Sequence, residues 1–159
     1  MARALNTAKR RRPFTVYVLL ILLLFQAVSA IFGGIALTID PSGELLQIPL
    51  SLLQGSPFRS YLAPGLFLLA VLGVYPLVVL YGMLTLRPFH AANALNIYKE
   101  RHWSLTHALY VGIILILWIT LQILFIGYGH IIQTLYGLFG VLITIFALLP
   151  SVKKYFSNR

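Results

Sequence analysis

Residues 38–65, TIDPSGELLQIPLSLLQGSPFRSYLAPG, form the polar break that divides this chain into membrane-spanning units. The break holds two of the three acidic residues and four of the eight prolines. Its Asp40-Pro41-Ser42-Gly43 sequence is typical of a turn, but the leucines and isoleucines that follow are too numerous for a solvated loop. We therefore expect the segment 39–63 to lie on the membrane surface or to dip between the helix ends as a re-entrant lid.

Two short helical pieces are predicted inside this segment. Pro49 interrupts any continuous helix, so the first piece is expected at 49–54, ended by Gly55. Ser56 and Pro57 are typical of an N-cap and a first helical turn, which favours a second piece at 57–62. Because its apolar content is high, we favour a partly embedded lid over a flat surface helix.

The composition requires lipid as a solvent for much of the chain. Hydrophobic residues make up 60% of the 159 residues and charged residues only 9%, whereas a soluble domain carries about 25% charged residues. The formal charge of +9 would also suit a nucleic-acid partner. However, the basic residues cluster at the ends of apolar runs, as in membrane proteins, so no nucleic-acid binding is expected. The chain has no cysteine, which excludes disulfides and thiolate chemistry.

The apolar runs predict an all-α integral membrane protein, an antiparallel bundle of four transmembrane helices at 14–38, 64–86, 105–126 and 131–149. Each run is long enough to cross roughly 30 Å of hydrocarbon. The first run continues well past Ala30, which ends a possible cleavage site, and this favours a retained helix over a signal peptide. The connection 127–130 is so short that the last two helices must form a hairpin. We expect one membrane domain spanning 1–159.

The remaining segments are polar and basic. Residues 1–13 and 150–159 are expected to be basic tails, and Pro150 is expected to end the fourth helix. The connection 87–104 has a helical period, which fits either an amphipathic helix on the membrane surface or an ordinary solvated helix. Trp103 is expected to be an anchor at the membrane interface.

The basic residues also predict the orientation. Eleven of the twelve Lys and Arg residues lie in the first, third and fifth of the five flanking segments, and the twelfth is Arg59 in the second. The positive-inside rule then places both termini in the cytoplasm, with the lid and the 127–130 hairpin on the outer side. The size and layout resemble those of many small bacterial inner-membrane proteins, so we expect a multi-pass protein of the plasma membrane, the inner membrane of a bacterium.

Neutral polar and small residues are the notable features inside the spans, because no Asp, Glu, Lys or Arg lies there. This argues against a pump or coupled transporter. Pro76 should kink the second helix and free the carbonyl of Leu72. Gln26 lies at a similar depth and is expected to bond that carbonyl or Tyr75. Small residues in the first helix, which include Ala30 and Gly34, should let a neighbouring helix approach closely.

The outer side is the only place where acidic, basic, histidine and tyrosine side chains can converge. The candidate ligand-binding residues are Asp40, Glu44, Arg59, Tyr61, Gln122, Tyr128, His130 and Gln133. A structural role competes with this interpretation: Asp40 or Glu44 would pair with Arg59 to hold the lid, and His130 would cap the fourth helix. His107 is interpreted as an interfacial residue. No metal, cofactor or catalytic motif is predicted.

Two functional hypotheses follow. The first is a non-enzymatic membrane protein that binds lipid or partner helices, with the bilayer, a bound lipid, a second copy or another membrane protein as partner. The second is a lipid-processing enzyme or lipid carrier with a polar site under the lid. A pore would need a polar lining that these four spans hardly offer.

Overall fold

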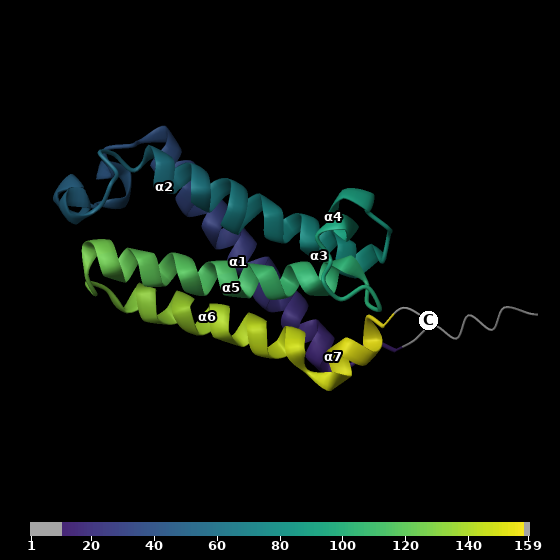
Figure 1. Ribbon diagram of the computed structural model, residues 1–159. Coiled ribbons are helices and arrows are strands. Elements are labelled where there is room, and N and C mark those ends of the chain that lie inside the picture. The colour runs from purple at the N-terminus through teal and green to yellow at the C-terminus, as the bar shows by residue number, and fades with distance from the viewer. Residues whose placement is uncertain (1–10, 158–159) are drawn as a thin grey trace, which may run out of the picture.

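The computed structural model describes residues 11–157 as an antiparallel bundle of four helical spans (Figure 1). Helix α1 (Phe14–Ile39) is the first span, and helices α5 (Trp103–Ile126) and α6 (Ile131–Leu148) are the third and fourth. The second span consists of α2 (Leu62–Phe67), a π-helix η3 (Leu68–Val74) and α3 (Tyr75–Thr85). Each span is long and apolar enough to cross a membrane. The predicted all-α membrane bundle is confirmed, with boundaries that differ by at most two residues.

The connecting segments gather at opposite ends of the bundle (Figure 1). One end, here called the basic end, contains the start of α1, the connection between α3 and α5 with the short helix α4 (His90–Ala94), and helix α7 (Pro150–Tyr155). The other end, here called the lid end, contains the segment 40–61 and the α5–α6 hairpin. The segment 40–61 includes two 3-10 helices, η1 (Glu44–Leu46) and η2 (Leu50–Gly55).

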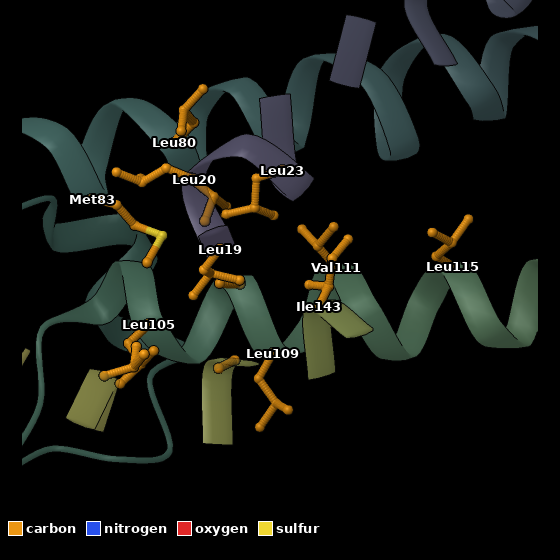
Figure 2. Close-up of a cluster of buried hydrophobic side chains, with 14 of the residues drawn as sticks. Leu19, Leu20, Leu23, Leu80, Met83, Leu105, Leu109, Val111, Leu115 and Ile143 are labelled. Carbon is orange, nitrogen blue, oxygen red and sulfur yellow. The ribbon is translucent and has the colours of Figure 1, made fainter. Parts of the chain in front are cut away.

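A continuous apolar core joins the four spans. Figure 2 shows side chains from α1, α3, α5 and α6 meeting in it. Its fully buried members include Leu19, Leu23, Leu72, Met83, Leu115 and Ile143. Phe156, beyond α7, is also buried. The described part of the predicted basic tail 150–159 therefore forms α7, which carries Lys153 and Lys154 and folds back onto the bundle.

The small-residue stripe of α1 packs against the second span of the same chain. Ala30 is buried in the core. A Cβ on Gly34 would lie 2.6 Å from the backbone nitrogen of Leu69, so only glycine permits this approach. The close approach predicted from the stripe thus occurs within one chain.

Pro76 is accommodated by a change of helical register. The π-helix η3 ends one residue before α3 begins at Tyr75, with Pro76 in the first turn of α3. Proline has no N–H to donate, so the hydrogen-bond ladder must skip a carbonyl around this position. Gln26 Nε2 donates to the carbonyl of Leu72 at 3.5 Å, the partner predicted from the sequence. Tyr75, the alternative partner, bonds His107 instead.

The lid segment is less helical than predicted. The piece 49–54 exists as the 3-10 helix η2, which continues through Gly55. The second piece, 57–62, does not form, because the chain turns irregularly until α2 begins at Leu62. Ser56 still acts locally, since its hydroxyl accepts a hydrogen bond from Phe58 N at 3.2 Å. The segment contacts the end of α5, where a Cβ on Gly55 would lie 2.5 Å from the carbonyl oxygen of Phe125.

The connection at the basic end also differs from the prediction. Its helix α4 has five residues, and the apolar Leu95 that follows it is 67% exposed. The polar Asn96 is fully buried, the reverse of the amphipathic pattern that was predicted. Trp103 begins α5 and is buried, so this residue packs inside the protein at the end of the span and does not present its ring to the bilayer. The predicted short helix is limited to α4, and a compact turn structure follows it that covers the ends of α3 and α5.

Candidate functional site

Asp40 serves the turn that follows α1. Its Oδ1 accepts hydrogen bonds from Ser42 N at 3.1 Å and from the Ser42 hydroxyl at 2.5 Å, and its Oδ2 accepts one from Leu45 N at 2.7 Å. These bonds, the Ser42 hydroxyl first among them, lower the pKa of Asp40 below its ordinary value. The carboxylate is therefore committed to local backbone geometry.

Glu44 and Arg59 are exposed, and the ion pair predicted for Arg59 does not form. Within residues 11–157, no carboxylate of Asp40 or Glu44 lies within 4.0 Å of a basic group; the ion pair present there joins Arg101 and Glu100. No hydrogen bond within the same range connects any two of Asp40, Glu44, Arg59 and His130. The side chains expected to converge are thus not brought together.

Tyr61 is a structural pin of the lid segment. It is 6% exposed, its hydroxyl donates to the carbonyl of Pro49 at 3.0 Å, and its amide donates to the carbonyl of Pro41 at 2.9 Å. Gly43, with φ +83°, lies against the Tyr61 ring, where a Cβ would come within 2.8 Å. Burial raises the pKa of Tyr61. The single tyrosine thereby ties both halves of the segment together.

The α5–α6 hairpin uses its polar side chains to satisfy its own backbone. His130 is the N-cap of α6 and accepts from Ile132 N at 3.5 Å, as the structural interpretation predicted. Gln133 Oε1 accepts from Gly129 N at 3.0 Å, and Gln133 Nε2 donates to Gly127 O at 3.2 Å. Tyr128 bonds Thr134, and Gln122 makes no hydrogen bond with its side chain among residues 11–157. Gln122 and Gln133 are therefore not hydrogen-bonded to each other.

An open groove of about 470 Å³ lies within the lid segment. Its lining consists of Ser42, Glu44, Gln47, Ile48, Pro49 and Leu50. Glu44 is the only ionisable side chain of this lining, so the groove does not place an acid beside a base. It offers little chemistry for a reaction.

A second cleft, about 290 Å³ in volume, lies at the basic end between α3 and the connection to α5. It is lined by Val78, Tyr81, Gly82, Arg87, Pro88, Phe89 and Trp103. Its walls are mostly apolar, and the Arg87 guanidinium and the Tyr81 hydroxyl adjoin each other, because Arg87 Nη1 donates to the Tyr81 hydroxyl at 3.1 Å. The sequence analysis missed this site, although Arg87-Pro88-Phe89 directly after an apolar run was a visible signal.

Trp103 forms the rigid wall of this cleft. Its ring lies over Gly82, where any Cβ would collide with the indole. Its Nε1 donates to the carbonyl of Arg87 at 2.9 Å, and Phe89 packs edge-on against the ring with centroids 5.7 Å apart. The buried indole therefore holds the backbone that presents Arg87.

His102 fixes the same carbonyl a second time. Because a carbonyl can only accept, the 3.2 Å contact to Arg87 O requires a proton on His102 Nε2, and Nδ1 then accepts from the Ser104 hydroxyl at 2.8 Å. Burial lowers the pKa of His102, which favours this neutral form. The position of Arg87 is thus set by two ring N–H groups.

His107 packs against Trp103, the residue that forms the wall of the cleft. It is 4% exposed, and its Nε2 donates to Ala92 O at 2.9 Å. Nδ1 of this tautomer accepts from the Tyr75 hydroxyl at 2.8 Å, and the ring packs edge-on against Trp103 at 5.5 Å. His107, expected near the membrane interface, is a buried link between the second span, α4 and α5.

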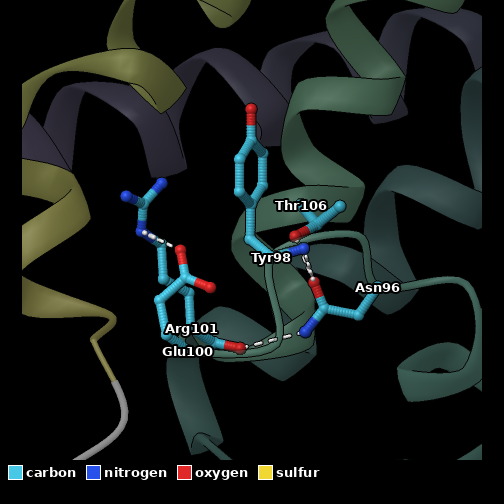
Figure 3. Close-up of polar contacts among 5 residues, drawn as sticks. All are labelled: Asn96, Tyr98, Glu100, Arg101 and Thr106. Atoms are coloured by element: carbon cyan, nitrogen blue, oxygen red, sulfur yellow. Dashed lines mark hydrogen bonds and ion pairs between the residues drawn. The ribbon is translucent and has the colours of Figure 1, made fainter.

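Asn96 orders the other half of the connection (Figure 3). Its Oδ1 accepts from Tyr98 N at 3.1 Å and from the Thr106 hydroxyl, and its Nδ2 donates to Arg101 O at 3.0 Å. The neighbouring His102 amide donates to Phe156 O at 2.8 Å. The chain on both sides of the cleft is therefore anchored to α5 and to the segment after α7.

Comparisons with protein-family models, with curated proteins and with solved structures found no match to this chain.

Proposed function

We propose that this multi-pass membrane protein binds a lipid, without chemical conversion, in the cleft between α3 and the α3–α5 connection. The observation that carries the proposal is the pairing of apolar walls with a single polar corner formed by Tyr81 and Arg87. Ligand sites combine a mostly apolar lining with a few placed polar groups in this way.

The cleft is accessible from the bilayer. Val78 is 39% exposed and Tyr81 is 52% exposed, so the lining continues onto the outer surface of α3. The volume is at the lower limit of the roughly 300–1,000 Å³ of ligand pockets. It therefore suits the glycerol region of a lipid whose acyl chains remain in the bilayer beside α3.

The two other hypotheses, a protein that binds partner helices and a lipid-processing enzyme or carrier, rested on features that have other roles in this structure. The small-residue stripe with Ala30 and Gly34 packs within the chain, so it no longer favours a partner helix. The polar side chains of the lid end are engaged in their own turns or exposed, so they do not favour a lipid-processing site. The clustering of basic residues at the end that holds the cleft favours a cytoplasmic location for it.

Native mass spectrometry with a matched pair of variants tests this proposal. Val78→Trp should fill the cleft, whereas Leu66→Trp places the same indole at an exposed position of the same span that does not line it. We expect wild type and Leu66→Trp to retain one lipid per chain after extraction, and Val78→Trp to lose it. A wild type that carries and rebinds no lipid would contradict the proposal, as would equal retention by both variants.

A further inference from the structure

We infer that the cleft at the basic end selects an anionic phospholipid, with its phosphate bound by the Arg87 guanidinium and the Tyr81 hydroxyl. This inference rests on the proposed lipid binding and adds the class of lipid and the residues that recognise it. It does not follow from the apolar walls, which would accept any acyl lipid. It follows from the donors at the corner of the cleft and from the charge around them.

The donors at this corner are available to an anion. Arg87 Nη1 donates to Tyr81, and a guanidinium has five N–H donors in all. Within residues 11–157, no carboxylate lies within 4.0 Å of Arg87. The Tyr81 oxygen accepts from Arg87, so its own proton is free to be donated to the same anion. Bidentate Arg–phosphate contacts are among the stronger charge-assisted hydrogen bonds.

The backbone of Arg87 is held in place before any ligand arrives. Its carbonyl accepts from Trp103 Nε1 and His102 Nε2, and its amide donates to the Thr85 hydroxyl at 3.4 Å. A fixed backbone reduces the entropy lost when the side chain is ordered on a ligand. These hydrogen bonds therefore hold Arg87 in place at the cleft, although this residue lies beyond the end of α3.

The surrounding charge favours an anionic over a zwitterionic headgroup. Glu100 is the only acidic residue of the described basic end and already pairs with Arg101 at 3.6 Å. The basic residues of the same end are Arg11, Arg12, Arg87, Lys99, Arg101, Lys153 and Lys154. Each basic residue near an anionic membrane surface contributes about 1 kcal/mol of attraction, and the same residues would repel the amine of a zwitterionic headgroup.

The polar corner of the cleft lies at the depth that is expected of a lipid phosphate. Arg87 follows the end of the second span at Thr85 by two residues, and Trp103 begins the third. The ends of spans lie at the level of the headgroups. Val78 lies two turns deeper along α3, where acyl chains begin, so one lipid can satisfy both parts of the cleft.

The test titrates the delipidated full chain in detergent with phosphatidylglycerol and with phosphatidylcholine of the same acyl chains, followed by native mass spectrometry. Both lipids offer the same phosphate to Arg87 and Tyr81, so the preference depends on the choline cation, which the basic residues repel. We therefore expect wild type to prefer phosphatidylglycerol by about fivefold or more. Arg87→Gln should abolish the preference, whereas Tyr81→Phe removes a donor to the phosphate that both lipids share and should weaken the binding of both. Arg11→Gln is the matched control, since it removes one charge from the same end without touching the cleft.

The outcomes separate the two proposals. If wild type binds neither lipid, the proposed function itself fails. If it binds both equally, or if Arg87→Gln keeps the preference while its thermal stability matches wild type, lipid binding stands and the headgroup inference is overturned. Displacement of phosphatidylglycerol by an equal concentration of glycerol 3-phosphate would also overturn it, because the site would then recognise a soluble anion. An Arg11→Gln variant that loses the preference would indicate diffuse attraction instead of a site.

Discussion

Replacing Gln26 by methionine should stabilise this protein, although Gln26 is a buried polar residue that bonds a neighbouring helix. Gln26 is 1% exposed, and its Oε1 has no hydrogen-bond partner in the described part of the chain. A buried, unsatisfied acceptor costs about 1–3 kcal/mol. The bond that Nε2 donates to Leu72 O is 3.5 Å long, and interhelical bonds in membranes contribute only about 0.6 kcal/mol on average.

Methionine has nearly the same length and no buried acceptor. The free energy of unfolding of the variant should therefore exceed that of wild type by about 0.5–2 kcal/mol. The assay is reversible unfolding in mixed micelles, read by helical circular dichroism as a function of denaturing detergent. The matched control is Gln133→Met, because the Gln133 amide bonds three backbone groups of the hairpin and its loss should destabilise. A Gln26→Met variant less stable than wild type by more than about 0.5 kcal/mol would refute this reasoning.

Three further predictions concern other parts of the chain. Asn96→Ala should destabilise the protein by about 2–4 kcal/mol, because it removes four side-chain hydrogen bonds and leaves buried groups unpaired; the shift in unfolding midpoint measures it, and Asn93→Ala, which removes only one of these bonds from an exposed side chain, should shift it far less. Gly34→Leu should separate α1 from the second span and lower the melting temperature in detergent, whereas Gly137→Leu, where a Cβ would lie 3.8 Å from a side-chain methyl of Ile119, should be tolerated; equal losses would contradict the close-approach argument. Because the pKa of Asp40 is lowered from 3.8, its contribution to stability is present above pH 3.8 and is lost as the pH falls through the lowered value; melting curves should show a larger acid-induced loss for wild type than for Asp40→Asn, and parallel losses would count against the turn role of this carboxylate.

Part of the candidate site could be predicted from the sequence, and part could not. The turn at Asp40, the cap at His130 and the Gln26–Leu72 contact depend on neighbours in sequence or on depth along a helix, so local chemistry predicts them. The proposed convergence of Asp40, Arg59 and His130 required knowledge of distances between loops. The residue types in the loops do not give these distances. In the structure each of the three side chains either bonds a group nearby in the chain or is exposed to solvent.

The cleft at the basic end illustrates the opposite case. Its walls come from α3, from the α3–α5 connection and from the first residue of α5. A helical period in the connection favoured an amphipathic helix, but the chain turns inward at Asn96 because the amide satisfies three backbone or hydroxyl groups at once. The hydrogen bonds made by the buried Asn96 amide outweigh the weak helical preference of the connection.

The sequence by itself determined the number of spans, their nearly exact boundaries and the gathering of basic residues at one end. Those properties follow from the length of apolar runs and from where charge interrupts them, because a bilayer admits backbone only as satisfied helices. The tertiary structure decided which side chains meet: Gly34 against Leu69, Trp103 over Gly82, and Arg87 fixed beside Tyr81. These contacts depend on helix rotation and on how the connections fold back, which the packing of the whole bundle sets and no single stretch of sequence encodes.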